Sequence, residues 1–259
     1  LIFLAFLAGC GKGEMLGKSS QSQHFVEQTI EAFAKIPGTF QQVLFARFKP
    51  SRLNDLVVLT RTRDNKSGLH VLLNVGKGRF VSNENILLDA EAKLDIRFIA
   101  ATDLDRDGGD DLILLVRASD GTMSAKVMFN NKKGYFYEKE GSILPPIRKG
   151  VERVDTVDID HDGNIDLFFS GIKMIDSQGE IDKYQSQILV NNGKGQFKDN
   201  TSLLMPQLRP GIVAPIFADF DGDEVMDLFL VYESGQNAIY FNNGLGSLTN
   251  ENSQALPMI

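Results

Sequence analysis

Cysteine, histidine and tryptophan are almost missing from this sequence. Its 259 residues include one cysteine, three histidines and no tryptophan. A single cysteine cannot form a disulfide within the folded chain, so the fold needs another source of stabilisation. With so few thiols and imidazoles, we do not expect a zinc or copper site, because such groups are the usual ligands of those metals.

Basic clusters are lacking as well. The sequence has 27 Lys and Arg against 34 Asp and Glu, which gives a net charge of −7. A chain without a positive face cannot neutralise phosphates, so nucleic-acid binding is excluded as a function class. Long helical stripes are also absent, and short apolar runs alternate with clusters of turn residues that include many of the 24 glycines. This pattern favours a globular, all-β chain.

The first ten residues, LIFLAFLAGC, form an apolar run that is too short to span a bilayer. The run has the form of a secretory signal ending at a cleavage site, and Leu7 to Cys10 resembles the bacterial lipobox. The resemblance implies cleavage before Cys10 and lipid attachment to its sulfur; the alternative is a signal peptide with an incidental cysteine. The residue after Cys10 is Gly11 and not Asp. By resemblance to the sorting of bacterial lipoproteins, this favours location in the outer membrane, if the cell has one. Since neither a basic segment nor a methionine precedes this run, we expect the chain to be incomplete at its start.

Residues 11–23 are rich in Gly, Ser, Lys and Gln and predict a flexible tether. The next segment, 24–38, predicts a short helix that ends at Pro37-Gly38. We expect the folded part to cover residues 24–259 and the tether to hold it away from a membrane.

A run of aspartates at fixed spacing occurs three times. DLDRDGGDD, DIDHDGNID and DFDGDEVMD begin at Asp103, Asp158 and Asp219, and each places Asp at positions 1, 3, 5 and 9. Their starts differ by 158 − 103 = 55 and 219 − 158 = 61 residues. A repeat protein is therefore the leading hypothesis.

A fourth copy of the segment precedes these three. Stepping back 103 − 47 = 56 residues finds RFKPSRLND at Arg47, which keeps only the final aspartate, Asp55. Arg47, Lys49 and Ser51 replace the other three acids, so we expect no metal here. Lys49 is expected to act as a built-in substitute for the ion by pairing with Asp55.

A second signature follows each aspartate segment. LNVGKGRF, FNNKKGYF, VNNGKGQF and FNNGLGSL begin at Leu73, Phe129, Val190 and Phe241. Asn and Gly accept the positive φ angles that tight hairpins require. Each repeat thus predicts a strand, an acidic loop, two strands joined by a variable connection, an Asn/Gly turn and a last strand, which together make a four-stranded antiparallel blade. The predicted blades cover about residues 40–95, 96–150, 151–211 and 212–259.

The aspartate spacing suits a hard divalent cation. Side chains at positions 1, 3 and 5 of a tight loop turn inward, a backbone carbonyl at position 7 joins them, and position 9 completes the all-oxygen shell that Ca²⁺ prefers. Without an ion, the crowded carboxylates would repel one another and raise their own pKa values. The alternative is that they only form turns. The predicted ligands are Asp103, Asp105, Asp107, the Gly109 carbonyl and Asp111 in the first site; Asp158, Asp160, Asp162, the Asn164 carbonyl and Asp166 in the second; and Asp219, Asp221, Asp223, the Val225 carbonyl and Asp227 in the third.

These loops are not EF-hands. An EF-hand needs a bidentate Glu at position 12, where this sequence has Leu114, Phe169 and Leu230 inside predicted strands. Asp110 adjoins the first loop but is out of register.

The two signatures together resemble the FG-GAP/VCBS repeat family, known from the β-propeller of integrin α-subunits and from many bacterial exported proteins. The resemblance covers about residues 40–250 and implies a propeller with one structural calcium per intact loop, about three in all. Glu224 stands where the other loops have Gly108 and Gly163, so the third loop is expected to be strained or to bind more weakly. Propellers of this family resemble rings of about seven blades, which favours a fragment of a longer propeller over a complete four-bladed protein.

The function predicted from these features is a calcium-stabilised binding module on a lipid anchor, at the cell surface or in the periplasm, with the outer membrane or cell surface of a bacterium as the expected location. It would contact a protein or glycan through loops such as 171–187. The alternatives are the propeller domain of a polysaccharide hydrolase or lyase, and a structural spacer. An enzyme is not the expected reading, because His24, His70 and His161 lack a recognisable catalytic partner and no nucleophile motif occurs.

Overall fold

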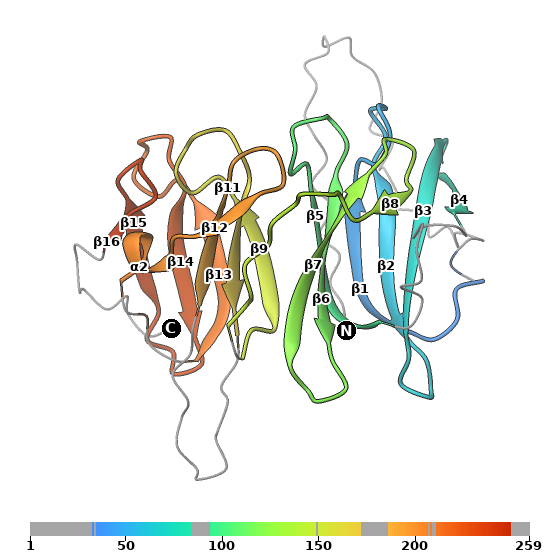
Figure 1. Ribbon diagram of the computed structural model, residues 1–259, viewed down its shortest axis with the longest axis horizontal. Helices are drawn as coiled ribbons and strands as arrows, with labels where there is room; N and C mark the ends of the chain where they lie inside the picture. Colours follow the sequence, from blue (N-terminus) through green and yellow to red (C-terminus); the bar gives the residue numbers. More distant parts are fainter. Residues whose placement is uncertain are drawn as a thin grey trace, which may run out of the picture.

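The computed structural model describes residues 33, 35–83, 94–148, 150–171, 186–206, 208 and 211–249. These residues form four sheets, each of four antiparallel strands in sequence order, with one four-residue helix, α2 (Thr201–Leu204). The sheets stand side by side like the blades of a propeller (Figure 1). The predicted all-β fold of four-stranded blades is therefore confirmed.

Each blade is a consecutive run of four strands. Blade 1 contains β1 (Thr39–Ala46), β2 (Asp55–Arg61), β3 (Ser67–Gly76) and β4 (Arg79–Asn83), and blade 2 contains β5 (Asp95–Thr102), β6 (Asp111–Arg117), β7 (Met123–Asn130) and β8 (Phe136–Tyr137). Blade 3 contains β9 (Arg153–Val157), β10 (Asp166–Ser170), β11 (Gln187–Asn191) and β12 (Phe197–Asp199), and blade 4 contains β13 (Ile212–Ala218), β14 (Asp227–Tyr232), β15 (Ala238–Asn242) and β16 (Leu248–Thr249).

The second strand of an inner blade is buried on both faces. In β6, Leu112 and Leu114 pack toward blade 1, while Ile113 and Leu115 pack toward blade 3. This explains why the sequence after Asp111 is a continuous apolar run rather than an alternating one. We call the side of a blade that faces the preceding blade its entry face, and the side that faces the following blade its exit face.

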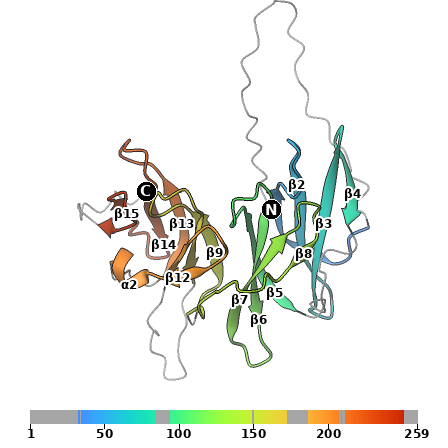
Figure 2. The same ribbon diagram turned by 45° about the horizontal axis from the view of Figure 1, so that its top comes forward.

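The core lies between blades rather than within them. One cluster of buried residues joins blades 1 and 2, a second joins blades 2 and 3, and a third joins blades 3 and 4. Among the described residues no such cluster joins blade 4 to blade 1, and the two views show these blades at opposite ends of the row (Figures 1 and 2). On the entry face of blade 1, Phe33 and Ile36 pack over Leu56, Val58 and Leu72.

Several predictions lie outside the described residues. These are the signal segment with Cys10, the tether, most of the helix at 24–38, and residues 172–185 of the long loop. Within the part of the chain that the structure does describe, no helix is long and apolar enough to cross a membrane.

Candidate metal centres

The three aspartate loops occupy the same place in their blades. Each joins the first strand to the second, between β5 and β6, β9 and β10, or β13 and β14. As predicted, the residues at position 12 of the loops, Leu114, Phe169 and Leu230, lie within strands.

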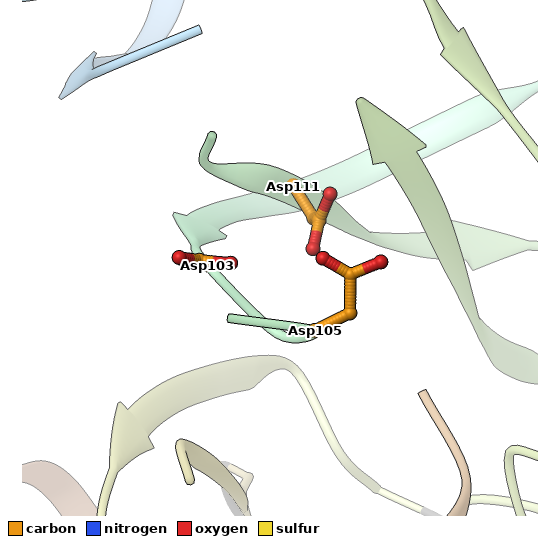
Figure 3. A group of neighbouring side chains, drawn as sticks. All are labelled: Asp103, Asp105 and Asp111. Carbon is orange, nitrogen blue, oxygen red and sulfur yellow. The ribbon is translucent and has the colours of Figure 1, made fainter. Parts of the chain in front are cut away.

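Each loop brings three of its four aspartates together. One ligand atom from each member of a group lies within 4.8 Å of the others. Figure 3 shows the first group, in which the carboxylates of Asp105 and Asp111 point toward each other and Asp103 approaches from the start of the loop. The three groups are Asp103, Asp105 and Asp111; Asp158, Asp160 and Asp166; and Asp219, Asp221 and Asp227.

The aspartate at position 1 shapes the loop. The two carboxylate oxygens of Asp103 accept the backbone N–H groups of Asp107 at 3.0 Å and Gly108 at 2.8 Å. Asp158 repeats this with Asp162 and Gly163. Because a carboxylate oxygen has more than one lone-pair site, these bonds leave room for a cation.

The aspartate at position 9 is buried and bonded on both oxygens. Asp111 accepts the N–H of Leu104 at 3.0 Å and the N–H of Asn130 at 2.8 Å, so it ties the loop to β7. Asp166 and Asp227 make the equivalent pair of bonds in their own blades. Burial raises the pKa of Asp111 and of Asp166 to about 7. The backbone hydrogen bonds lower the pKa, but the effect of burial is larger.

The aspartates at position 3 carry the clearest sign of a missing partner. Oδ1 of Asp105 and Oδ1 of Asp160 are buried and accept no hydrogen bond. Burial raises the pKa of Asp160, and the charge of Asp162 adds to the rise. A buried carboxylate oxygen without a donor is costly unless a cation fills its coordination. The first two groups therefore fit a bound cation, whereas Asp221 of the third group is exposed.

The aspartates at position 5 lie outside the three groups. Instead, Asp107 accepts the N–H of Gly109 at 2.9 Å, and Asp162 and Asp223 accept the N–H groups of Asn164 at 2.7 Å and Val225 at 2.9 Å. These bonds tighten the turn around position 7. The metal-ligand roles of these aspartates, and of the carbonyls at Gly109, Asn164 and Val225, stay predictions.

A lysine enters the first group. Nζ of Lys139 donates to Oδ2 of Asp105 at 2.8 Å and lies 4.8 Å from the centre of the Phe129 ring. The pKa of Lys139 is raised mainly by the bond to Asp105. This pair was not predicted, because Lys139 is far from the aspartate motif in the sequence.

The fourth loop has the expected substitute for an ion. Nζ of Lys49 lies 3.5 Å from Oδ1 of Asp55, which confirms the predicted pairing. Asp55 also accepts the N–H groups of Phe48 at 3.1 Å and Asn74 at 2.7 Å, so it keeps the role of a position-9 aspartate.

The third loop uses its glycine at a different position. In the first two loops a non-glycine residue at position 4, Arg106 or His161, and a glycine at position 6 have positive φ angles. In the third loop Gly222 at position 4 has φ 88° and Glu224 at position 6 has φ 70°. The predicted strain at Glu224 is present, but Gly222 relieves the strain that the other loops have at position 4.

A hydrogen bond between blades was missed by sequence reasoning. The side-chain amide of Asn130 donates to the carbonyl of Phe48 at 2.9 Å, across the interface of blades 1 and 2. The equivalent bonds run from Asn191 to Leu104 at 2.8 Å and from Asn242 to Ile159 at 2.7 Å. The first Asn of the turn signature recurs in all four repeats, and this recurrence could have indicated the bond. The need of the turn for an Asn already explained the residue, so its second role was not predicted. We call this bond the asparagine latch.

The comparisons with known proteins point to one repeat family. The family model described as an FG-GAP-like repeat matches residues 103–169 and 180–230, which include all three aspartate groups. No curated protein matches the chain.

Proposed function

We propose that this chain, which belongs to the FG-GAP-like repeat family, is a calcium-stabilised β-propeller module that is lipid-anchored on a bacterial surface and binds a protein or glycan. The observation that carries the calcium assignment is the pair of buried carboxylate oxygens of Asp105 and Asp160, which accept no hydrogen bond. The family match and the four propeller-like sheets support an interaction module.

Calcium suits the donor set better than other common ions. Carboxylates and a loop carbonyl give only hard oxygen ligands, and a loop site of variable geometry tolerates the six to eight ligands of Ca²⁺ better than the strict octahedron of Mg²⁺. The aspartates at positions 1, 3 and 9 of each loop would hold the ion. When bound, it would neutralise crowded carboxylates and join the loop to the second strand of its blade.

The proposed role of calcium is structural. If each site had a Kd of about 0.1 mM in about 1 mM calcium, binding would stabilise the folded state by roughly 1.4 kcal/mol per site. Three sites would then contribute about 4 kcal/mol, which is comparable to a disulfide in a chain that has none within its fold.

The non-enzymatic reading rests on the surroundings of the described histidines. His70 lies in β3 with Nε2 3.2 Å from the hydroxyl of Thr60, and burial lowers its pKa. His161 is exposed at position 4 of the second loop. The Thr60 hydroxyl beside His70 is 0% exposed, so a substrate could not reach it as a nucleophile. Binding is therefore the function we propose.

The anchor and location rest on the sequence of Leu7 to Cys10. The test is expression of the precursor in a bacterium, followed by mass spectrometry of the mature N-terminus and cell fractionation. We expect a diacylglycerol thioether on Cys10 and recovery with membranes, and we expect Cys10→Ser to abolish both. An unmodified Cys10 in a secreted, processed protein would contradict the anchor and leave the fold unaffected.

The calcium sites can be counted directly. We expect native mass spectrometry of the calcium-loaded protein to show about three bound ions, and the double variant Asp105→Asn, Asp160→Asn to show about one. The matched control is Asp64→Asn, because Asp64 is an exposed acid paired with Lys66 outside the loops.

The class of ligand can be identified on arrays of glycans and of surface proteins that are probed with and without calcium. Binding that survives the loss of all three ions would contradict a role for the folded loops.

A further inference from the structure

The loop end of blade 1 is strongly basic, although the chain as a whole is acidic. Asp55 joins the loop at this end to the Asn/Gly turn, because it accepts the N–H groups of Phe48 and Asn74. The loop, residues 47–55, and the turn, residues 73–80, contain one acid, Asp55, and five cations, Arg47, Lys49, Arg52, Lys77 and Arg79. The net charge of the two segments is therefore 5 − 1 = +4.

The loop and the turn of blade 1 form one surface. Nζ of Lys49 donates to the carbonyl of Asn74 at 3.1 Å, across 25 positions of the sequence. A Cβ placed on Gly76 would lie 3.9 Å from a methyl carbon of Leu53, and Arg79 pairs with Gly76 across the turn. The fold thus gathers cations from two separate segments, which is why no basic cluster was expected from the sequence.

Most of these cations lack an acidic partner. Lys49 pairs with Asp55, and Arg47 lies close enough to Asp110 of blade 2 for their charges to interact. Among the described residues, no carboxylate forms an ion pair with the other three cations, which are exposed: Arg52, Lys77 and Arg79. A group of uncompensated cations attracts anionic partners.

Two apolar side chains lie among these cations. Leu53 is 40% exposed and Val75 is 46% exposed. Val75 stands where the turns of the other three blades have a polar residue, Asn131, Asn192 or Asn243. Blade 1 has therefore exchanged both the acids of its loop and a polar residue of its turn. We call Arg52, Leu53, Val75, Lys77 and Arg79 the basic patch.

The position of the patch in the repeat is an exposed one whether or not a blade has neighbours. Blades 2 and 3 pack against another blade on both sides. Even so, Gly108 and Gly163, the equivalents of Arg52, are exposed in these blades. The equivalents of Val75 and Lys77 are exposed there as well, namely Asn131, Lys133, Asn192 and Lys194. The packing of blades side by side therefore leaves this surface free.

We propose that the basic patch docks on a membrane surface that contains anionic lipids. The cations would contact the lipid headgroups, and Leu53 and Val75 would reach the boundary between headgroups and acyl chains. Basic residues around exposed apolar ones are the combination that binds such surfaces. A soluble polyanion would use the cations but would leave Leu53 and Val75 in water, so an anionic membrane fits the patch better.

An anchor at Cys10 would permit this contact. Phe33 lies against Phe40 with ring centroids 5.9 Å apart, and Phe40 pairs with Thr60, near the end of β2 away from the patch. The 33 − 10 = 23 residues from Cys10 to Phe33 span at most roughly 76 Å. An eight-residue strand such as β1 is only about 26 Å long, so the sequence before blade 1 is long enough for the anchor and the patch to reach one membrane.

The test is flotation of the unlipidated chain that begins at Gly11 with lipid vesicles, at one fixed calcium concentration. We expect binding to vesicles of phosphatidylglycerol mixed with phosphatidylcholine, and little binding to phosphatidylcholine alone. The double variant Arg52→Gln, Lys77→Gln should weaken binding to the mixed vesicles about 30-fold, the effect of two cations at an anionic lipid surface.

The matched control is the double variant Arg63→Gln, Lys66→Gln. It removes the same charge from the exposed connection between β2 and β3, at the other end of blade 1, and should leave binding almost unchanged. Melting temperatures of both double variants show whether the fold is intact. No binding to the mixed vesicles, or an equal loss in the two double variants, would overturn the proposal.

A single tryptophan tests the contact of the apolar residues with lipid. The sequence contains no tryptophan, so Val75→Trp gives one fluorescent reporter in the patch. Its emission should shift to shorter wavelength on the mixed vesicles and be quenched by brominated lipid. The control is Ser119→Trp, because Ser119 is exposed between β6 and β7, at the end of blade 2 away from its aspartate loop.

Vesicle binding with an unshifted emission of Val75→Trp would overturn the membrane assignment and indicate a soluble polyanion as the partner. An equal shift in both tryptophan variants would also overturn the assignment, because the patch would then not be the surface that meets the lipid. The inference rests on blade 1, and not on calcium or on Cys10, so its failure would leave both of those proposals standing.

Discussion

Nζ of Lys49 lies 3.5 Å from Oδ1 of Asp55, in the blade whose loop has lost its other three acids. An ammonium group thus stands near the position-9 carboxylate where the other loops gather three aspartates. The arrangement indicates two separate roles within one motif. The position-9 aspartate organises the blade in all four repeats, and the aspartates at positions 1 and 3 are present only where a cation is proposed.

The first prediction separates these roles at Asp55. Asp55→Ala removes the acceptor of the Phe48 and Asn74 N–H groups and leaves Lys49 without its acidic partner, with the Asn74 carbonyl as its remaining acceptor. We expect a loss of about 2–4 kcal/mol in the free energy of unfolding, equal with and without calcium. Urea unfolding in both conditions measures it. A loss that appears only in calcium would mean that the fourth loop also holds an ion.

The second prediction concerns Asp160. Asp160→Asn removes a carboxylate whose buried Oδ1 accepts no hydrogen bond. The melting temperature should fall in calcium, because one ion is lost, and should stay level or rise slightly in metal-stripped protein, because repulsion from neighbouring acids is relieved. Differential scanning calorimetry with Asp64→Asn as control measures both. An equal fall in the two conditions would show that Asp160 acts only in folding.

The third prediction follows from the pKa of about 7 for Asp111 and Asp166, raised by burial from an ordinary value of 3.8. A raised folded-state pKa means that the folded protein holds these protons more tightly than the unfolded chain. Their stabilisation is complete below about pH 4 and is lost as the pH rises toward 7. Metal-stripped protein should therefore lose stability over this range.

Bound calcium should remove that loss, because a cation favours the ionised carboxylates. Urea midpoints between pH 5 and 8, with and without calcium, measure the two slopes. In metal-stripped protein, the urea midpoint of Asp166→Asn should depend less on pH than that of the unchanged protein, whatever the absolute stability of the variant. A midpoint of metal-stripped protein that rises with pH, and does so equally in Asp166→Asn, would contradict the assignment.

The fourth prediction concerns Lys139, which donates to Asp105 at 2.8 Å. A fixed positive charge in the first group should oppose calcium binding there. Lys139→Met should tighten the first site by roughly three- to tenfold, which corresponds to about 1 kcal/mol for a partly exposed pair. Lys198→Met is the control, since Lys198 is an exposed residue of β12 outside the loops. Unchanged or weaker calcium binding by Lys139→Met would show that the lysine does not compete with the ion.

The fifth prediction concerns Glu224, which has φ 70°. Glu224→Gly should raise the free energy of unfolding by about 0.5–1 kcal/mol, because glycine adopts this conformation without strain. Glu224→Ala removes the same charge but keeps the strain, so it should not stabilise the protein. Equal effects of the two variants would assign the change to charge.

The sequence predicted the blades because two local patterns repeat together. The aspartate segments and the Asn/Gly turns each depend on backbone conformations that few residues accept, and they recur at similar intervals. The Lys49 to Asp55 pair was predictable for the same reason. Comparison with the three other copies of the loop shows which acids have been replaced and which one remains.

The interactions that were missed connect different blades or distant parts of one. The asparagine latch joins residues 82 to 87 positions apart, and Lys139 reaches Asp105 across 34 positions. The spacing of the motif also could not show that Asp107 would bond to Gly109 and stay outside the group. The docking of blades decides such contacts, and local periodicity does not contain that information.

The most direct test of calcium binding by the three aspartate loops is a calorimetric calcium titration of metal-stripped protein that begins at Gly11, with the melting temperature recorded at each end point. We expect about three bound ions per chain and a higher melting temperature in calcium. No bound calcium, in protein shown by circular dichroism to be folded, would contradict it and would leave the aspartates as residues that only form turns.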